Sequence, residues 1–246
     1  MKSKIKSALM LLTALLVLQA CKKNDTFPPS TVASLSFVNA TVGSSPVIVR
    51  INNPNTIYST LSAVNKLSYG AGNLFSPVAG STAFAVVQST DTLHTLFSGN
   101  LPLQNYNIYS FYLAGTVSKP DTVFIHENLP QYVKTDSVAG IRFINLSQNA
   151  NAVSVDIKGQ SNGSEVQSLN YKGRTGFKTY KADHTVASYV FEFRDATTGS
   201  LLATYTLSGV NNNSATVANT ARFFNQTIAL IGGGTTATSA ILIANH

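Results

Sequence analysis

Residues 32–39 read Val-Ala-Ser-Leu-Ser-Phe-Val-Asn, and a similar phrase, Val-Ala-Gly-Ile-Arg-Phe-Ile-Asn, occupies residues 138–145. The two copies lie 106 positions apart, and a short polar loop and an alternating apolar run follow each. In the first copy, Ala33, Leu35 and Phe37 alternate with serines, a period of two that predicts a half-buried β-strand. The phrase therefore predicts two copies of one β unit, each opened by this strand.

Further matches extend the repeat along the chain. The apolar run at 47–51 returns at 153–157, again 106 positions later. Phe-Tyr-Leu-Ala-Gly at 111–115 is matched by Ile-Ala-Leu-Ile-Gly at 228–232, at an offset of 117. The longer offset implies a net insertion in the second unit, which we place near residues 211–220.

Turn residues separate short strand-like runs at intervals of roughly 8–12 residues, the pattern of a sandwich or barrel. Each unit has about 100 residues, which fits an immunoglobulin-like β-sandwich. We therefore predict an all-β protein with two tandem immunoglobulin-like domains, at 32–128 and 138–246, joined by a linker at 129–137. Gly99 and Asn100 are expected to end the strand that precedes them.

Residues 1–20 have the features of a secretion signal, because lysines precede an apolar stretch too short to span a hydrocarbon core of about 30 Å. The stretch ends in Leu18-Gln19-Ala20-Cys21, which resembles the lipobox of bacterial lipoproteins. In such a motif the small Ala20 would precede the cleavage site and the thiol of Cys21 would take the lipid. The alternative is an incidental cysteine beside an ordinary cleavage site.

Residues 21–31 are predicted to be the lipidated cysteine and a flexible tether, because Pro28 and Pro29 preclude a helix. A single acyl chain binds a membrane only marginally, whereas the several chains of a mature lipoprotein would attach it firmly. The expected partner at this end is thus the membrane, through acyl chains on Cys21. The expected localisation is the cell envelope, in the outer membrane, with the facing leaflet left open.

The composition excludes several classes of protein. Charged residues make up 11% of the chain, against about 25% in an average soluble domain. Of the net charge of +7, three units belong to lysines of the expected signal segment, and the remaining +4 does not form the concentrated basic footprint of a nucleic-acid binder, so no nucleic-acid partner is expected. One cysteine allows no internal disulfide.

Taken together, these motifs resemble one group of cell-envelope lipoproteins. They are the lipobox, the polar tether, the repeated Phe-(Val/Ile)-Asn, the Leu-x-Tyr, and the tyrosine-rich strand ending in Leu-Ala-Gly. The group comprises Bacteroidetes-type lipoproteins with tandem immunoglobulin-like domains of unknown function. The resemblance covers most of the mature chain and implies a fold and a location. Its motifs are structural, so it assigns no residue a chemical role.

No constellation of reactive side chains is recognisable. The four histidines are His94, His126, His184 and His246. We interpret Asp183-His184 as a solvated loop pair and His126-Glu127 as a strand-edge pair at the exit to solvent. Neither pair has the partners of a catalytic triad or the ligand spacing of a zinc site. The sequence therefore predicts no catalytic, cofactor-binding or metal-binding residue and no cofactor.

One basic cluster interrupts the second unit, interleaved with aromatic residues. Its cations are Lys172, Arg174, Lys178 and Lys181. The cluster could contact a polyanion, such as an acidic glycan or lipid headgroups. The alternative interpretation is the solvated side of a hairpin.

Two functions follow from these features. The first is a non-enzymatic, membrane-anchored envelope lipoprotein that acts as an interaction, adhesion or structural module, with envelope proteins or glycans as partners. The alternative is a glycan-binding accessory lipoprotein of a polysaccharide-uptake system. Sugar sites often use tryptophan as a flat platform, and the chain has no tryptophan, so tyrosine and phenylalanine would have to replace it. A hydrolase is a third possibility, for which no set of residues is marked.

Overall fold

The computed structural model describes the chain from Thr31 onward. The residues it describes are 31–52, 66–133, 135–148, 151–214, 216, 218–234 and 236–245. Within these ranges no helix is long and apolar enough to cross a membrane. The signal segment, Cys21 and the tether up to Ser30 lie outside the described residues.

The described residues form β-strands joined by turns and loops. The first eight strands are β1 (Ser34–Asn39), β2 (Val47–Ile51), β3 (Lys66–Leu67), β4 (Gly72–Phe75), β5 (Gly80–Gln88), β6 (Thr95–Leu103), β7 (Ile108–Gly115) and β8 (Pro120–His126). The next eight are β9 (Val138–Asn145), β10 (Val153–Ile157), β11 (Val166–Leu169), β12 (Lys178–Lys181), β13 (Ser188–Asp195), β14 (Leu201–Ser208), β15 (Asn225–Gly233) and β16 (Thr236–Asn245).

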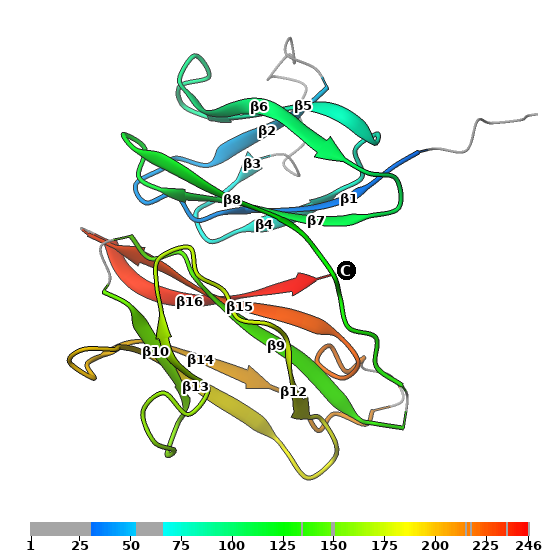
Figure 1. Ribbon diagram of the computed structural model, residues 1–246, viewed down its shortest axis with the longest axis vertical. Helices are drawn as coiled ribbons and strands as arrows, with labels where there is room; N and C mark the ends of the chain where they lie inside the picture. The colour runs from blue at the N-terminus through cyan, green and yellow to red at the C-terminus, as the bar shows by residue number, and fades with distance from the viewer. Residues whose placement is uncertain are drawn as a thin grey trace, which may run out of the picture. The chain divides into compact units, whose positions relative to one another are not determined.

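The strands form four sheets of four strands each. Their orders are β3-β2-β5-β6 and β4-β1-β7-β8 in the first half, and β12-β9-β15-β16 and β11-β10-β13-β14 in the second. Each strand of the second half thus takes the place of the strand eight numbers earlier. Figure 1 shows the four sheets as successive layers. The all-β sandwich prediction is confirmed, and we refer to β1–β8 as the first sandwich and β9–β16 as the second.

The repeated opening strand has the same partners in both sandwiches. β1 runs parallel to β7, with Phe37 opposite Phe111, and β9 runs parallel to β15, with Phe143 opposite Ile228. On its other side each strand pairs antiparallel with a short edge strand, β4 or β12. The recurring phrase therefore lies in an interior strand of its sheet.

Each sandwich encloses its own apolar core. In the first, the ring of Phe111 lies 5.0 Å from that of Phe84 and 4.9 Å from that of Phe97. In the second, the ring of Phe143 lies 5.2 Å from that of Phe191. Leu35 and Phe37 are fully buried in the first core, as the alternation along residues 32–39 predicts.

A third apolar cluster joins the two sandwiches. It packs Val38, Ala40, Tyr112, Ala114 and Ile125 of the first sandwich against Ile144, Leu146, Ala229, Ile231 and Ile243 of the second. They belong to the two sheets that face each other across the junction, and each side chain points away from the core of its own sandwich. We name this cluster the junction layer; because of it, β7, β9 and β15 are buried on both faces along almost their whole length.

Two details of the strands and of the repeat, as predicted from the sequence, need correction. Gly99 and Asn100 do not end a strand, since β6 runs through both and pairs them with Phe84 and Ala83 of β5. An offset of 106 would match residues 83–87 to 189–193, but the structural offset between β5 and β13 is 107, because Phe84 lies opposite Ile51 while Phe191 lies opposite Ile157. The sequence pattern reveals neither detail, because a glycine inside a strand resembles a turn signal and adjacent apolar residues fit either register.

The asparagine that ends each opening strand is a buried structural residue. The side-chain amide of Asn145 donates to the Leu169 carbonyl at 3.0 Å, and its oxygen accepts the backbone N–H of Ser147 at 3.1 Å. Asn39 makes the equivalent bonds to Leu67 and Thr41. Neither asparagine has any exposed surface. This recurring residue therefore closes a turn and ties it to the other sheet of its own sandwich.

Replacement of Asn145 by alanine is expected to lower the free energy of unfolding by about 1–3 kcal/mol, because a buried carbonyl and a buried N–H lose their partner. Urea denaturation of Asn145→Ala measures the change. Asn100→Ala is a control, because this exposed side chain on β6 should shift stability by no more than about 0.5 kcal/mol. Equal stability of the two variants would contradict the assignment.

The segment between the sandwiches is fixed to β15. The Tyr132 hydroxyl donates to the Asn225 side chain at 2.7 Å, and the Asn225 amide donates to the Pro130 carbonyl at 2.8 Å. Tyr132 lies directly over Gly140, where an added Cβ would come within 1.9 Å of the hydroxyl oxygen. The crossing between the two sandwiches is therefore held in one position on the second.

Candidate functional site

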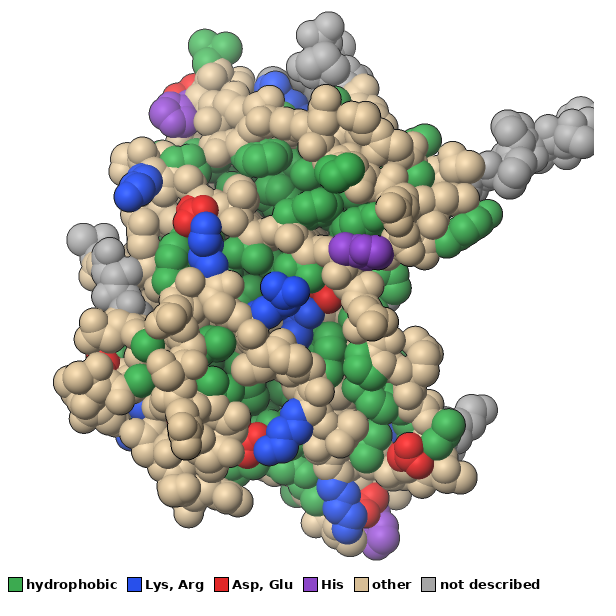
Figure 2. Space-filling view, in the orientation of Figure 1, with side chains coloured by type: hydrophobic (Ala, Val, Ile, Leu, Met, Phe, Trp, Pro, Cys, Tyr) green, Lys and Arg blue, Asp and Glu red, His purple; other side chains and the backbone are tan. Residues whose placement is uncertain are grey.

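A cleft of about 510 Å³ opens where the two sandwiches meet. We name it the junction cleft. One wall comes from the end of β8 and the segment after it, and the other from the loop between β11 and β12. Its lining residues are Ile125, His126, Glu127, Asn128, Pro130, Arg142, Lys172, Gly173, Arg174, Thr175, Gly176 and Phe177. In Figure 2 basic side chains gather at the middle of the face shown, with a histidine beside them.

The floor of the cleft is a buried ion pair between the sandwiches. The Arg142 guanidinium donates to both carboxylate oxygens of Glu127, at 2.7 and 2.5 Å, and their side chains are 4% and 2% exposed. Arg142 also donates to Thr227 at 2.7 Å and to the Tyr112 hydroxyl at 3.3 Å. Burial opposes the positive charge, but the bonds to Glu127 outweigh it and the pKa of Arg142 is raised.

Aromatic rings lie next to this pair. The Arg142 guanidinium carbon is 4.6 Å from the centre of the Phe177 ring, a cation–π contact. On the opposite wall the His126 ring stacks on Tyr109 at 4.9 Å, and Tyr109 stacks on Phe124 at 5.4 Å. Since Tyr109 is buried while His126 is exposed, the stack presents the histidine at the mouth of the cleft.

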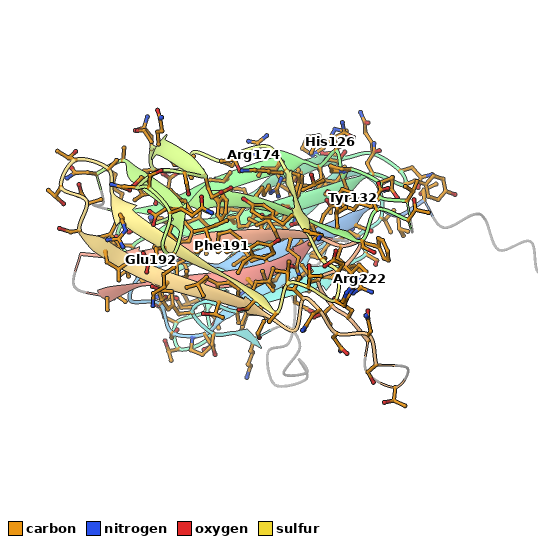
Figure 3. All side chains as sticks on the ribbon, turned by 90° about the horizontal axis from the view of Figure 1, so that it is seen from below. His126, Tyr132, Arg174, Phe191, Glu192 and Arg222 are labelled. Carbon is orange, nitrogen blue, oxygen red and sulfur yellow. The ribbon has the colours of Figure 1, made fainter. Side chains whose placement is uncertain are left out.

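The loop that carries the cations of the cleft is held by β9. The Thr175 N–H donates to the Phe143 carbonyl at 2.9 Å, and the Phe143 N–H donates to the Thr175 hydroxyl at 3.0 Å. Arg174 forms an isolated β-bridge with Ile144. These bonds fix the backbone on either side of the exposed Arg174 side chain, which Figure 3 labels on the same side of the molecule as His126.

Lys172 reaches from the second sandwich to the first. Its ammonium lies 2.9 Å from the carboxylate of Asp121. Partial burial opposes the charge of Asp121, but the hydrogen bonds from Lys172 and Thr122 prevail and lower the pKa of this carboxyl. Burial, together with the nearby charge of Asp121, raises the pKa of Tyr171 to about 12. A second polar contact, largely exposed, thus spans the junction.

The predicted basic cluster divides into two pairs. Lys172 and Arg174 line the junction cleft. Lys178 and Lys181 lie on β12 outside it, where Lys178 pairs with Glu165 at 2.8 Å and Lys181 pairs with Asp183 at 3.0 Å. Both lysine side chains are exposed to solvent, but β12 is an edge strand that pairs with β9 and is not part of a hairpin.

The interpretation of His126-Glu127 as a solvent-facing pair is half wrong. His126 is exposed, but Glu127 is 8% exposed and faces the junction layer, where Arg142 neutralises it. The sequence carried a signal for this contact. Arg142 interrupts an apolar strand at the position where the first copy has Ser36, and a cation buried there requires a carboxylate partner.

The other histidines are scattered. His94 and His184 lie in exposed loops, and His246 is outside the described residues. Beside His184, the pKa of Asp183 is held well below its usual range by hydrogen bonds from Thr185 and Lys181. No group of three potential metal ligands occurs in the part of the chain that the structure describes.

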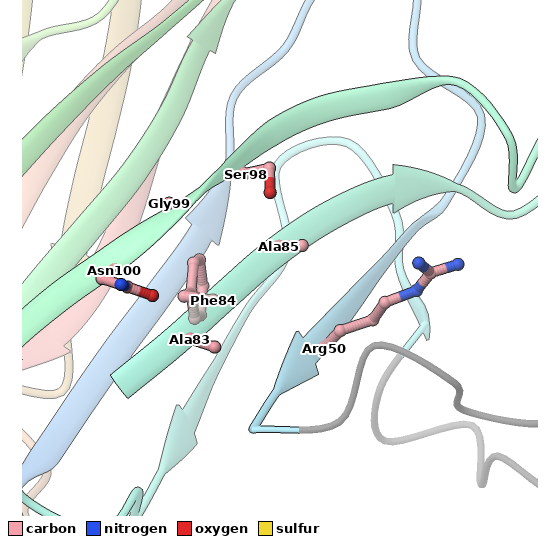
Figure 4. Close-up of a pocket in the computed structure, with 7 residues that line it drawn as sticks. All are labelled: Arg50, Ala83, Phe84, Ala85, Ser98, Gly99 and Asn100. Carbon is pink, nitrogen blue, oxygen red and sulfur yellow. The ribbon is translucent and has the colours of Figure 1, made fainter. Parts of the chain in front are cut away.

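A smaller trough of about 230 Å³ lies on the outer side of the sheet β3-β2-β5-β6. Its lining residues lie on β2, β5 and β6, and Figure 4 shows Ala83, Ala85 and Gly99 among them. The Arg50 guanidinium donates to the Thr92 carbonyl at 3.4 Å. With so many small side chains the trough offers few contacts, and we regard the junction cleft as the stronger candidate site.

Comparisons with known proteins relate the chain to a family. No curated protein matches it. Solved carbohydrate-binding modules of family 41 from streptococcal virulence factors share 13% identity, with a TM-score of 0.27 over 85% of this chain and 96% of theirs. An α-glucan-binding streptococcal virulence factor shares 11% identity, with a TM-score of 0.26 over 82% and 93%. These scores are too low to support an argument about fold or ligand.

A family model gives a firmer result. It matches residues 33–158, which are more than half of the 246-residue chain and include the first sandwich and the β9 and β10 strands of the second. The matched region also contains Glu127 and Arg142, the two residues of the buried ion pair. The chain belongs to the family described as a domain of unknown function, DUF4397.

Proposed function

We propose that the protein is a non-enzymatic cell-envelope lipoprotein whose two sandwiches act together as an interaction module, adhesive or structural. The observation that carries the proposal is the junction. An apolar layer and a buried ion pair fix two sandwiches together around a cleft that displays polar, cationic and aromatic side chains. A preformed surface of this kind suits binding, because little conformational entropy is lost when a partner docks.

The same surface offers little to an enzyme. Within the described ranges His126 is the one histidine that lines the cleft, and its stacking contact is with Tyr109. Glu127 is occupied by Arg142. A general base needs a free lone pair within hydrogen-bond reach of the substrate, which Glu127 cannot supply in this geometry.

Glycan binding is the second candidate function. The aromatic stack of His126, Tyr109 and Phe124 reaches the cleft mouth, and Phe124 is 36% exposed. The exposed rings of His126 and Phe124, which stack on the buried Tyr109, thereby provide flat faces in a chain without tryptophan. A glycan ligand would place the protein among the accessory lipoproteins of a polysaccharide-uptake system.

The module is tested by adhesion of the purified native lipoprotein, reconstituted in fluorescent vesicles, to isolated envelopes. Saturable adhesion is expected, because each vesicle carries a limited number of binding modules. Absence of adhesion would contradict the proposal. So would turnover of an ester, glycoside or peptide substrate that one point substitution abolishes.

Replacement of Cys21 by alanine is expected to abolish lipid attachment and release the protein from the membrane fraction, because the chain has no other thiol. Incorporation of radiolabelled palmitate and fractionation of the cells measure the two effects. Lys22→Ala is the matched control and should keep both label and membrane attachment. Label retained in Cys21→Ala would show that the anchor lies elsewhere.

A further inference from the structure

Arg174 differs from the other cations of the basic cluster. Lys172, Lys178 and Lys181 each lie within 3.0 Å of a carboxylate oxygen. Among the described residues no carboxylate lies within ion-pair distance of Arg174, although its side chain is exposed and lines the cleft. Since the floor pair of Arg142 and Glu127 is neutral overall, Arg174 gives the junction cleft a net positive charge.

The backbone and the rings around Arg174 are fixed. β9 holds the loop through Thr175, and the Phe177 ring is held under the Arg142 guanidinium. Across the cleft the His126 ring rests on Tyr109. Arg174, Phe177 and His126 therefore line one cleft, between two sandwiches that an apolar layer and a buried ion pair hold together.

We propose that the junction cleft binds an acidic saccharide, with its carboxylate or sulfate on Arg174 and the apolar face of a sugar ring against His126. This inference rests on the proposed binding function and names its ligand class. Arginine presents two parallel N–H donors that match the geometry of a carboxylate or a sulfate. A neutral sugar would leave the Arg174 guanidinium without a counter-charge.

Size and charge agree with this ligand. A cleft of about 510 Å³ falls within the range of roughly 300–1,000 Å³ typical of small-ligand sites. The Lys172 side chain is 41% exposed and lines the cleft, so its ammonium can turn from Asp121 to a second acidic group. Successive acidic sugar units could thus contact Arg174 and then Lys172.

The test uses the native lipoprotein in detergent and calorimetric titration with a glucuronate oligosaccharide, against a glucose oligosaccharide of equal length. Arg174→Gln is expected to weaken glucuronate binding by about 10-fold or more, the loss typical of a charge-assisted bond. Lys181→Gln removes the same charge from the same cluster outside the cleft, and it should change the affinity by less than about 2-fold because exposed charges are screened.

A second pair of variants tests the ring contact. His126→Ala should weaken glucuronate binding by about 3-fold to 10-fold if a sugar ring packs on it, by the usual contribution of an aromatic contact. Tyr106 is 75% exposed and does not line the cleft, so Tyr106→Ala should bind as the native protein does. Circular dichroism of each variant confirms that the sheets are intact.

Three results would overturn the inference. They are the absence of glucuronate binding at millimolar concentration, equal weakening by Arg174→Gln and Lys181→Gln, and tighter binding of phosphatidylglycerol vesicles than of the saccharide. Adhesion to envelopes that survives Arg174→Gln would overturn the assignment of the cleft and leave the binding module standing. Loss of all envelope adhesion in the native protein would instead contradict the proposed function itself.

Discussion

Glu127→Ala is expected to lower the free energy of unfolding by about 3–5 kcal/mol, because it leaves the Arg142 guanidinium buried without its counter-charge. Arg142 is 3% exposed, so without Glu127 its charge would have little contact with water. The loss should appear as a large drop in the urea midpoint and in the temperature of unfolding. For a unit of this size each kcal/mol corresponds to roughly 2–4 °C.

The double variant Arg142→Met/Glu127→Leu separates charge burial from packing. Because both charges leave together, its stability should lie within about 1 kcal/mol of the native protein or above it. Asp121→Asn breaks the exposed contact to Lys172 and should cost about 0–1 kcal/mol, as surface pairs do. If Glu127→Ala were no more harmful than Asp121→Asn, the buried pair would not hold the sandwiches together.

Gly115→Ala is the second substitution with a large expected effect. Gly115 joins β7 to β8 at a φ of +78°, and an added Cβ would lie 2.4 Å from the Lys119 carbonyl oxygen. Strain in this backbone region and the steric clash each cost roughly 1–3 kcal/mol. Gly232, its counterpart in the repeat, has a φ of +100° and the same 2.4 Å approach, there to the Ala237 oxygen.

Gly43→Ala isolates the contribution of the clash. Gly43 has a φ of +77°, almost that of Gly115, but its Cβ would meet nothing within 4 Å. The free energy lost by Gly115→Ala should exceed that lost by Gly43→Ala by the cost of the clash, about 1–3 kcal/mol. Thermal unfolding of the two variants measures this difference, and equal losses would refute the close approach at the β7–β8 turn.

The turn glycines and the asparagines show how far a repeated sequence predicts structure. Gly115 and Gly232 occupy matched positions of the repeat, and each adopts a positive φ at the corresponding hairpin of its own sandwich. Asn39 and Asn145 end the two copies of the repeated phrase, and the side-chain oxygen of each accepts the backbone N–H two residues on. Local conformational requirements leave such marks in the sequence because few residue types satisfy them.

The candidate site was less predictable. Sequence proximity grouped Lys172 and Arg174 with Lys178 and Lys181, but the direction in which each side chain points depends on where β12 begins. His126 and Tyr109 are 17 positions apart and stack only because β7 and β8 pair in one register. The ring stack at the cleft mouth therefore had no recognisable spacing in the chain.

The alternation along residues 32–39 by itself determined that Leu35 and Phe37 face a core, because a period of two follows from the geometry of one strand. Only the tertiary structure decided that Val38, on the opposite face, is also buried. The apolar surface that covers it comes from Ile144 and the strands of the second sandwich. Burial of a second face requires a partner surface, and no pattern within one strand specifies which distant surface it meets.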